Sequence, residues 1–197
     1  METFVTHPLQ TRGALRPALA MAGIALAGFG LLYSLAGTGL GRVLFPAQAT
    51  GSIVMREGAP VASSLVAQPF ADARYLQPRE SAAQYDPMAA AGSNQARTNP
   101  ELLARIARTR LQVAKRDGVA PEEVAADLLT QSGSGLDPDI SPAAAEQQVV
   151  RIARARGLAE ARVHQAIASA THAPQFGFLG PARVNVVRAN LALDALK

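Results

Sequence analysis

The side chains of this sequence that could do chemistry are few, and their spacing argues against the common catalytic and metal sites. The chain contains no cysteine, which excludes disulfides, thiolate metal ligands and a cysteine nucleophile. His164 and His172 are too far apart for an i,i+4 metal pair on a helix, and no HExxH motif accompanies them. We therefore interpret His7, His164 and His172 as surface or core residues and predict no metal site.

One polar, glycine-rich run, Ser132-Gly133-Ser134-Gly135, resembles a phosphate-binding loop. In a P-loop the glycines are followed by a lysine and a hydroxyl residue, whereas here Leu136 and Asp137 follow. The run also lacks the Gly-x-Ser-x-Gly elbow of a serine hydrolase. Its glycines permit positive φ, and Asp137 can bond to its own backbone before Pro138. The run predicts either a rigid, shaped loop between helices or an ordinary interhelical turn.

The lack of catalytic and metal-binding motifs favours a binding or assembly protein over an enzyme, with no cofactor of its own. The net charge is +4, but the arginines are scattered through predicted helices. No aromatic side chains are interleaved with them to form the stacking surface that nucleic acids require. We therefore predict no nucleic-acid partner, and interpret most of these arginines as parts of solvated helix faces.

A long uncharged run from Pro17 to Gly41 precedes all of these residues. It is long enough to cross the roughly 30 Å hydrocarbon layer of a bilayer as one helix. Arg12 and Arg16 precede it, and basic residues on a short tail favour a cytoplasmic N-terminus. The sequence thus predicts a cytoplasmic tail (1–16), a transmembrane helix in contact with membrane lipid (17–41) and an extracytoplasmic domain (42–197). A cleaved signal peptide is the alternative, because Ala47-Gln48-Ala49 has the small-x-small form of a cleavage site.

The predicted span carries a row of small side chains at helical spacing. Gly30, Ser34 and Thr38 form this row, and Gly37 and Gly41 are spaced likewise. Small residues let the backbone of a second helix approach closely, so the row predicts a partner helix in the membrane. The alternative is that these glycines reflect only the general frequency of glycine in transmembrane helices.

Two strands and a long irregular segment are predicted after the span. Ile53-Val54-Met55 and the run from Val61 to Val66 flank Arg56-Glu57-Gly58, which is typical of a hairpin with a tight turn. From Gln68 to Asn99 neither helical nor alternating periodicity persists. This segment is either a long ordered loop or a disordered linker, and its aromatic residues favour order.

Helical patterns dominate the remainder of the chain. Asn99-Pro100-Glu101 is a helix start signal, and Gly118 is the corresponding stop. Further helices are predicted to begin at Pro121 and to cover 141–157, 159–170 and 191–196, with strands at 176–179 and 184–187. The predicted fold class is α+β: one N-terminal transmembrane helix followed by a single mixed helix and sheet domain.

Several motifs follow one another along the chain in a specific order. They are Gly92-Ser93-Asn94, Thr98-Asn99-Pro100-Glu101-Leu102, Ser132-Gly133-Ser134-Gly135-Leu136-Asp137-Pro138, Ile140-Ser141-Pro142, Gln148, Arg151 to Gly157, Val184-Asn185-Val186, and Asn190-Leu191-Ala192-Leu193-Asp194. Taken together they resemble the KdpC family, the C subunits of the bacterial Kdp potassium-transporting P-type ATPase. The resemblance covers almost the whole chain from the span to the end.

The resemblance implies a non-catalytic accessory subunit of a high-affinity, ATP-driven potassium importer in the bacterial inner membrane. Its implied partners are a channel-like potassium-binding subunit, a P-type ATPase subunit and a small hydrophobic subunit. It also implies a catalytic chaperone that raises the ATP affinity of the ATPase subunit through a transient ternary complex with nucleotide. On this reading the candidate contacts with nucleotide or partner are Ser132, Gly133, Ser134, Gly135, Asp137, Gln148 and Arg151.

A free-standing, membrane-tethered extracytoplasmic binding protein or hydrolase is the alternative function. It would predict a stable monomer in detergent with a ligand or a turnover of its own.

Overall fold

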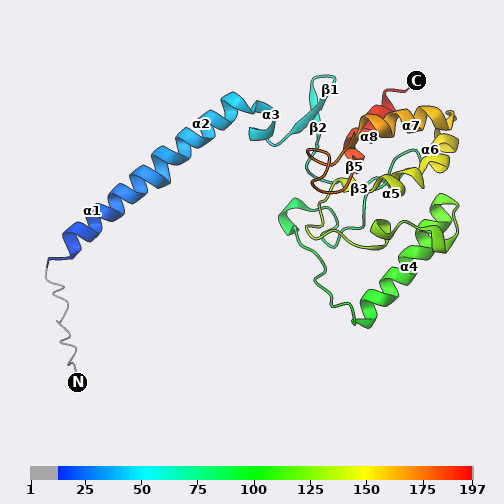
Figure 1. Ribbon diagram of the computed structural model, residues 1–197, viewed down its shortest axis with the longest axis horizontal. Coiled ribbons are helices and arrows are strands. Elements are labelled where there is room, and N and C mark those ends of the chain that lie inside the picture. Colours follow the sequence, from blue (N-terminus) through cyan, green and yellow to red (C-terminus); the bar gives the residue numbers. More distant parts are fainter. Residues whose placement is uncertain (1–12, 197) are drawn as a thin grey trace. The chain divides into compact units, whose positions relative to one another are not determined.

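The computed structural model describes residues 13–196. The chain divides into two compact units with a boundary between Gly51 and Ser52. The first contains one continuous helical stretch, Leu15–Leu44, of 30 residues, in which an 18-residue window has a mean hydropathy of 1.9. By length and composition this stretch can cross a membrane. The second unit is a mixed domain of helices and short strands, so the predicted α+β class is confirmed (Figure 1).

The long helix of the first unit is not uniformly α-helical. α1 (Leu15–Ala25) passes into a π-helical stretch, η1 (Leu26–Tyr33), and then into α2 (Ser34–Leu44). The hydroxyl of Ser34 donates to the carbonyl of Phe29 at 3.2 Å, five residues back along the helix. A short helix, α3 (Pro46–Ala49), follows.

The second unit begins with the predicted hairpin. β1 (Ile53–Arg56) pairs antiparallel with β2 (Ala59–Ser63), with Arg56 opposite Ala59. The turn residues Glu57 and Gly58 have φ of 51° and 80°. Two successive positive φ values are the signature of a type I′ turn, whose twist matches that of the strands. The tight polar turn is therefore confirmed.

The segment from Gln68 to Asn99 is ordered with very little secondary structure. Its only helical turn within the described residues is η2 (Pro87–Ala89), capped by the Asp86 carboxylate. Leu76 within it is fully buried in the hydrophobic core. Order, rather than a disordered linker, is thus the correct alternative for this segment.

The first long helix of the domain is built as its sequence signals predict. In α4 (Pro100–Asp117) the Asn99 side chain accepts from the backbone of Glu101. The helix ends at Gly118, whose φ of 73° is the left-handed conformation that favours glycine at a C-cap.

Two helices were predicted in the next stretch, and both predictions need correction. Pro121 opens only two 3₁₀ turns, η3 (Pro121–Glu123) and η4 (Ala126–Leu129), because Val124 between them is extended. The helix predicted over 141–157 is split into α5 (Pro142–Glu146) and α6 (Val149–Arg156). The break lies at Gln147 and Gln148, whose side chains are engaged in separate hydrogen bonds described below.

The C-terminal elements also differ partly from expectation. α7 (Glu160–Ser169) is confirmed. The strand predicted at 176–179 is wrong, because Phe176 and Gly177 both have positive φ and form a turn. The strand predicted at 184–187 is β5 (Arg183–Asn185), and the terminal helix α8 (Val186–Asp194) begins earlier than predicted. The reason is that the Asn185 side chain caps α8 by accepting from the backbone of Arg188 at 3.1 Å.

A small antiparallel sheet and the five helices α4 to α8 enclose the core. β5 lies between β3 (Asp139–Ile140) and β4 (Thr171–His172). α7 packs on α8 and on α6, and α4 contacts α6 (Figure 1). The most deeply buried large side chains come from these elements and from the irregular segment: Leu76, Val149, Ile152, Val163, Val184 and Leu193.

Candidate functional site

The most unusual feature of the domain is an irregular stretch, residues 73–79, that is held by side chains instead of by neighbouring strands. Six of its carbonyl groups accept hydrogen bonds from side chains of other elements. We call this stretch the clamped segment. Since a buried peptide group without a partner is costly, these side chains are what allow the stretch to cross the core without secondary structure. The donors are Arg151, Arg156, Asn190, Gln148 and Tyr85.

Two of these donors act as paired amide clamps. The side-chain amide of Asn190 accepts from the N–H of Leu76 at 2.7 Å and donates to its carbonyl at 2.8 Å. The amide of Gln148 does the same for Gln77, at 2.9 and 3.2 Å. Both amides are buried, with 2% and 0% of the residue exposed for Asn190 and Gln148. Each amide therefore reproduces the pair of hydrogen bonds that a neighbouring strand would supply.

An ion network lies beside the Gln148 clamp. The carboxylate of Asp117, with its side chain fully buried, pairs with Arg116 at 2.7 Å and with Arg151 at 2.8 Å. It also accepts from the side chain of Gln147 at 2.8 Å. Arg151 in turn donates to Gln148 at 2.6 Å, which joins the network to the clamp.

Burial and charge oppose each other at Asp117. Burial on its own raises the pKa of this carboxyl group, but the hydrogen bonds and charges of Arg116 and Arg151 outweigh it and hold the pKa below its usual value. Burial also lowers the pKa of Arg151, and Asp117 acts in the opposite direction. Asp117 is therefore a carboxylate whose ionised state is part of the folded structure.

The glycine-rich loop packs on the continuation of the clamped segment. The hydroxyl of Ser81 donates to the carbonyl of Gly135 at 2.6 Å. Gly135 has a φ of 72°, and a Cβ there would lie 2.8 Å from the carbonyl oxygen of Ala91. Asp137 pairs with Arg79 at 3.5 Å. The loop therefore has a defined shape and lies in close contact with residues 79–92. This agrees with the interpretation as a rigid, shaped loop and not with that as an ordinary interhelical turn.

The predicted site residues fall into two groups, and none of the hydrogen bonds described above joins one group to the other. Gln148 and Arg151 bind the clamped segment from the helix side. From the loop side, Asp137 binds Arg79 at the end of the clamped segment, and Ser132 and Gly135 bind its continuation at Glu80 and Ser81. Ser132 is buried, whereas Gly133 and Ser134 are exposed. Their contact with nucleotide or a partner stays a prediction.

Several residues of this site were missed from sequence. They are Asp117, Arg116, Gln147, Gln77 and Asn190. One signal was present: Asp117 is an acid in the last turn of a helix, where the helix dipole disfavours negative charge. Such a position indicates a carboxylate that is neutralised from elsewhere in the fold.

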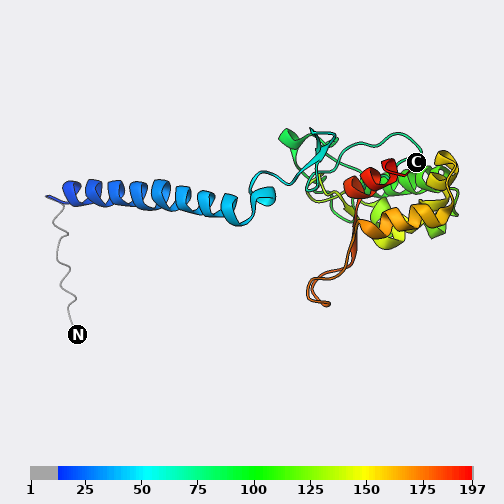
Figure 2. The same ribbon diagram turned by 90° about the horizontal axis from the view of Figure 1, so that it is seen from above.

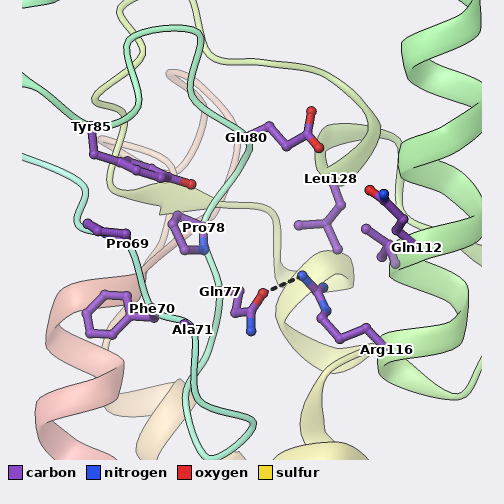
Figure 3. A pocket seen from close by; sticks show the side chains of 11 residues that line it. Pro69, Phe70, Ala71, Gln77, Pro78, Glu80, Tyr85, Gln112, Arg116 and Leu128 are labelled. Carbon is purple, nitrogen blue, oxygen red and sulfur yellow. Dashed lines mark hydrogen bonds between the residues drawn. The ribbon is translucent and has the colours of Figure 1, made fainter.

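A pocket of about 330 Å³ opens next to the clamped segment. Figure 3 shows Arg116 donating to the side chain of Gln77 among the residues that line the pocket, which also include Glu80 and Tyr85. Glu80 is engaged at 3.0 Å by the hydroxyl of Thr109. The pocket is lined by both polar and apolar groups, and its charged groups are already bonded within the protein.

In the first unit, the predicted row of small residues lies on an open surface. Gly30, Ser34 and Thr38 are exposed. A Cβ at Gly30 would meet nothing within 4 Å. Among residues 13–196, no group of three or more histidine, aspartate or glutamate residues is arranged to hold a metal ion.

Fold and site together define a protein with one N-terminal helix suited to a membrane and one α+β domain built around an internal polar network. Comparison with known proteins makes this class specific. A family model described as K+-transporting ATPase, c chain, matches residues 15–195. The chain belongs to the KdpC family of potassium-transporting ATPase subunits, so the resemblance stated from its motifs is confirmed.

Curated relatives agree along nearly the whole length. A protein of Xanthomonas oryzae pv. oryzae named potassium-transporting ATPase KdpC subunit is 63% identical, covering 95% of this chain and 90% of its own. Proteins of the same name from Gemmatimonas aurantiaca and Shewanella putrefaciens are 48% and 47% identical, covering 92% and 85% of this chain. The similarity therefore includes the apolar helix and the domain.

Proposed function

We propose that this chain is a non-catalytic accessory subunit of an ATP-driven potassium uptake complex of the bacterial inner membrane. The observation that carries the proposal is the match to the KdpC family over residues 15–195, which include a helix able to span a membrane. The internal bonding of the charged groups around the Asp117 network supports a structural role rather than a catalytic one.

The membrane helix anchors the chain and contacts a second helix through its small residues. Gly30, Ser34 and Thr38 are exposed along it, so nothing within residues 13–196 obstructs close approach of another backbone. The partners are the channel-like potassium-binding subunit, the P-type ATPase subunit and the small hydrophobic subunit of the same complex. Assembly then begins in the membrane and is completed by contacts of the domain.

The domain lies outside the cytoplasm in this proposal. A short basic tail before the span favours a cytoplasmic N-terminus. An effect of the subunit on the ATP affinity of the ATPase subunit would then pass through helix contacts in the membrane, since the domain and a cytoplasmic ATP site lie on opposite faces. Direct contact with ATP in a ternary complex requires the reverse orientation. The side of the membrane on which the domain lies therefore distinguishes an indirect effect on ATP affinity from direct contact with ATP.

Within the domain, the two groups of candidate residues have different roles. Gln148 and Arg151 are positioning residues, because their polar atoms are bonded to the clamped segment and to Asp117. Gly133, Ser134 and Asp137 keep solvent-accessible surface. Contact with a partner subunit is therefore assigned to the loop, in a shape that Gly135 and Ser132 maintain.

The orientation is tested by protease treatment of intact spheroplasts carrying an epitope fused after Lys197. Loss of the epitope without lysis supports an extracytoplasmic domain. Protection of the epitope until the membrane is broken would overturn it and restore the ternary complex with ATP. A cytoplasmic marker protein that survives the treatment is the control for intact membranes.

The membrane contact is tested by enlarging the small residues. In the Gly30→Leu/Ser34→Leu variant the side chains hold the partner helix away, so we expect several-fold less of the chain to co-purify with the other subunits. The matched control is Gly28→Leu/Ala36→Leu, which adds the same bulk on roughly the opposite face of the helix. Equal co-purification of both variants would refute the small-residue contact.

A further inference from the structure

The loop that joins β4 to β5, residues 173–182, presents large apolar side chains to solvent. We call it the tip loop; it projects from the domain (Figure 2). Phe176 is 78% exposed, Phe178 is 76% exposed and Leu179 is 49% exposed. Three large apolar side chains so close together in sequence and so exposed are typical of an interaction surface.

The tip loop is held in one shape by its own backbone. Gln175 and Leu179 exchange two hydrogen bonds, each of 2.9 Å, and the N–H of Gly177 donates to the carbonyl of Pro174 at 3.0 Å. Phe176 has a φ of 55°, a conformation that is unfavourable for a residue with a Cβ. Backbone strain of this kind is found where it serves a function. A loop fixed in advance also loses little conformational freedom when its side chains are bound.

Charge and area restrict what can cover the tip loop. Residues 173–182 contain no charged residue. Segments that bind a membrane surface combine apolar side chains with lysine or arginine, and the tip loop lacks this combination. An uncharged, rigid aromatic tip fits the apolar pocket of a protein better, because aromatic anchors in well-packed pockets dominate protein interfaces.

The tip loop is too small to recruit a free protein. Two phenylalanines bury on the order of 150–250 Å² each. With Leu179 the total stays below the roughly 800 Å² per partner of a stable interface. A contact of this size contributes when the two proteins are already held together by another contact, which raises the effective concentration. A second, freely diffusing copy of this chain does not meet that condition, whereas a subunit bound to its membrane helix does.

We infer that Phe176 and Phe178 insert into an apolar pocket on the extracytoplasmic side of a membrane-embedded subunit of the same complex. The inference goes beyond the proposed function, on which it rests for the partner and for the side of the membrane. The membrane helix supplies one contact and the tip loop a second, and together they fix the domain on its partner.

Photo-crosslinking in the purified complex tests the inference. The photoreactive residue p-benzoylphenylalanine replaces Phe178 in the full chain, expressed with the other subunits, and irradiation products are identified by mass. We expect an adduct with a membrane-embedded partner subunit. The control position is Met88, which is 94% exposed and lies outside the tip loop; we expect at least about tenfold less adduct from it.

The outcomes separate the inference from the proposed function. Lipid adducts alone, or no adduct at Phe178 in a complex that contains all subunits, would overturn the tip-loop contact and leave the subunit role intact. Failure of the unaltered chain to co-purify with the other subunits would overturn both. A second measurement uses Phe176→Ser/Phe178→Ser: we expect its detergent-solubilised complex to lose this subunit at least about tenfold faster than the unaltered complex, and an equal rate would also refute the contact.

Discussion

The clamped segment and the tip loop are opposites in where they place polar and apolar groups. Around the clamped segment, the side chains of Asp117, Gln148 and Asn190 are buried, and each of them is bonded to a neighbour. In the tip loop, phenylalanines are exposed and the backbone is bonded only locally. In water, polar groups are more stable when exposed and apolar groups when buried, so both regions depart from the usual arrangement. Each region therefore needs its own explanation.

The difference shows that the two regions serve different parts of the function. Buried polar groups are stable only when they are fully satisfied, so they fix one conformation of the domain. Exposed apolar groups contribute no stabilising free energy to the isolated domain, and they contribute only when a partner covers them. Substitutions in the polar side chains that hold the clamped segment should therefore act on folding, and substitutions in the tip loop on assembly.

The largest effect is expected from Asp117→Ala. Removing this carboxylate leaves Arg116 and Arg151 close together in a site from which their counter-ion has gone, and breaking a buried pair in this way costs about 3–5 kcal/mol. The measurement is denaturant unfolding of the full chain in detergent. Asp72→Ala is the control, because Asp72 pairs with Arg74 at the surface and its loss should leave the unfolding midpoint unchanged. Equal midpoints for both variants would contradict the buried network.

Gln148→Ala should have the next largest effect. It leaves the N–H and carbonyl of Gln77 without their partner, which costs about 1–3 kcal/mol. The control is Gln165→Ala, an exposed position on α7. The same variants, tested in the complex, examine the positioning role. If Gln148→Ala left stability, complex yield and apparent ATP affinity all unchanged, this residue would be removed from the site.

A structural feature of these regions can be predicted from the sequence when residues adjacent in the chain determine it. The Glu57-Gly58 turn and the α4 caps at Asn99 and Gly118 are set by adjacent residues, and all were predicted. The amide clamp between Gln148 and Gln77 joins positions 71 residues apart, so no local pattern reveals it.

The incorrect predictions have two different causes. The helix break at Gln147 and Gln148 was missed because their bonds to Asp117 and Gln77 exist only in the folded domain. Phe176 to Leu179 was predicted as a strand because an apolar run is typical of one. The positive φ of Phe176 and Gly177 turns it into a loop instead.

A smaller effect is expected from acid, through Asp194 at the edge of the clamped segment. Burial raises the pKa of its carboxyl group, but Arg156, Arg56 and Tyr75 outweigh it, so the pKa lies below its usual value. A depressed folded pKa means that the pairing stabilises the domain at pH above about 4 and is lost as the pH falls below that value. We expect the unfolding free energy to fall between pH 5 and 3, with a shallower slope in Asp194→Asn. Parallel slopes in the two proteins would contradict this assignment.

The smallest effect on stability is expected from substitutions in the tip loop, which should act on assembly instead. Phe176→Ser/Phe178→Ser should change the unfolding free energy of the full chain in detergent by no more than about 0.5 kcal/mol, because both side chains are already in solvent in the folded state. The control is Val184→Ala in the adjoining strand β5, a fully buried residue whose truncation should destabilise clearly. If the double substitution in the tip loop destabilised the isolated chain as much as Val184→Ala, the phenylalanines would belong to the core. The contrast between a polar interior that serves folding and an apolar tip that serves assembly would then fail.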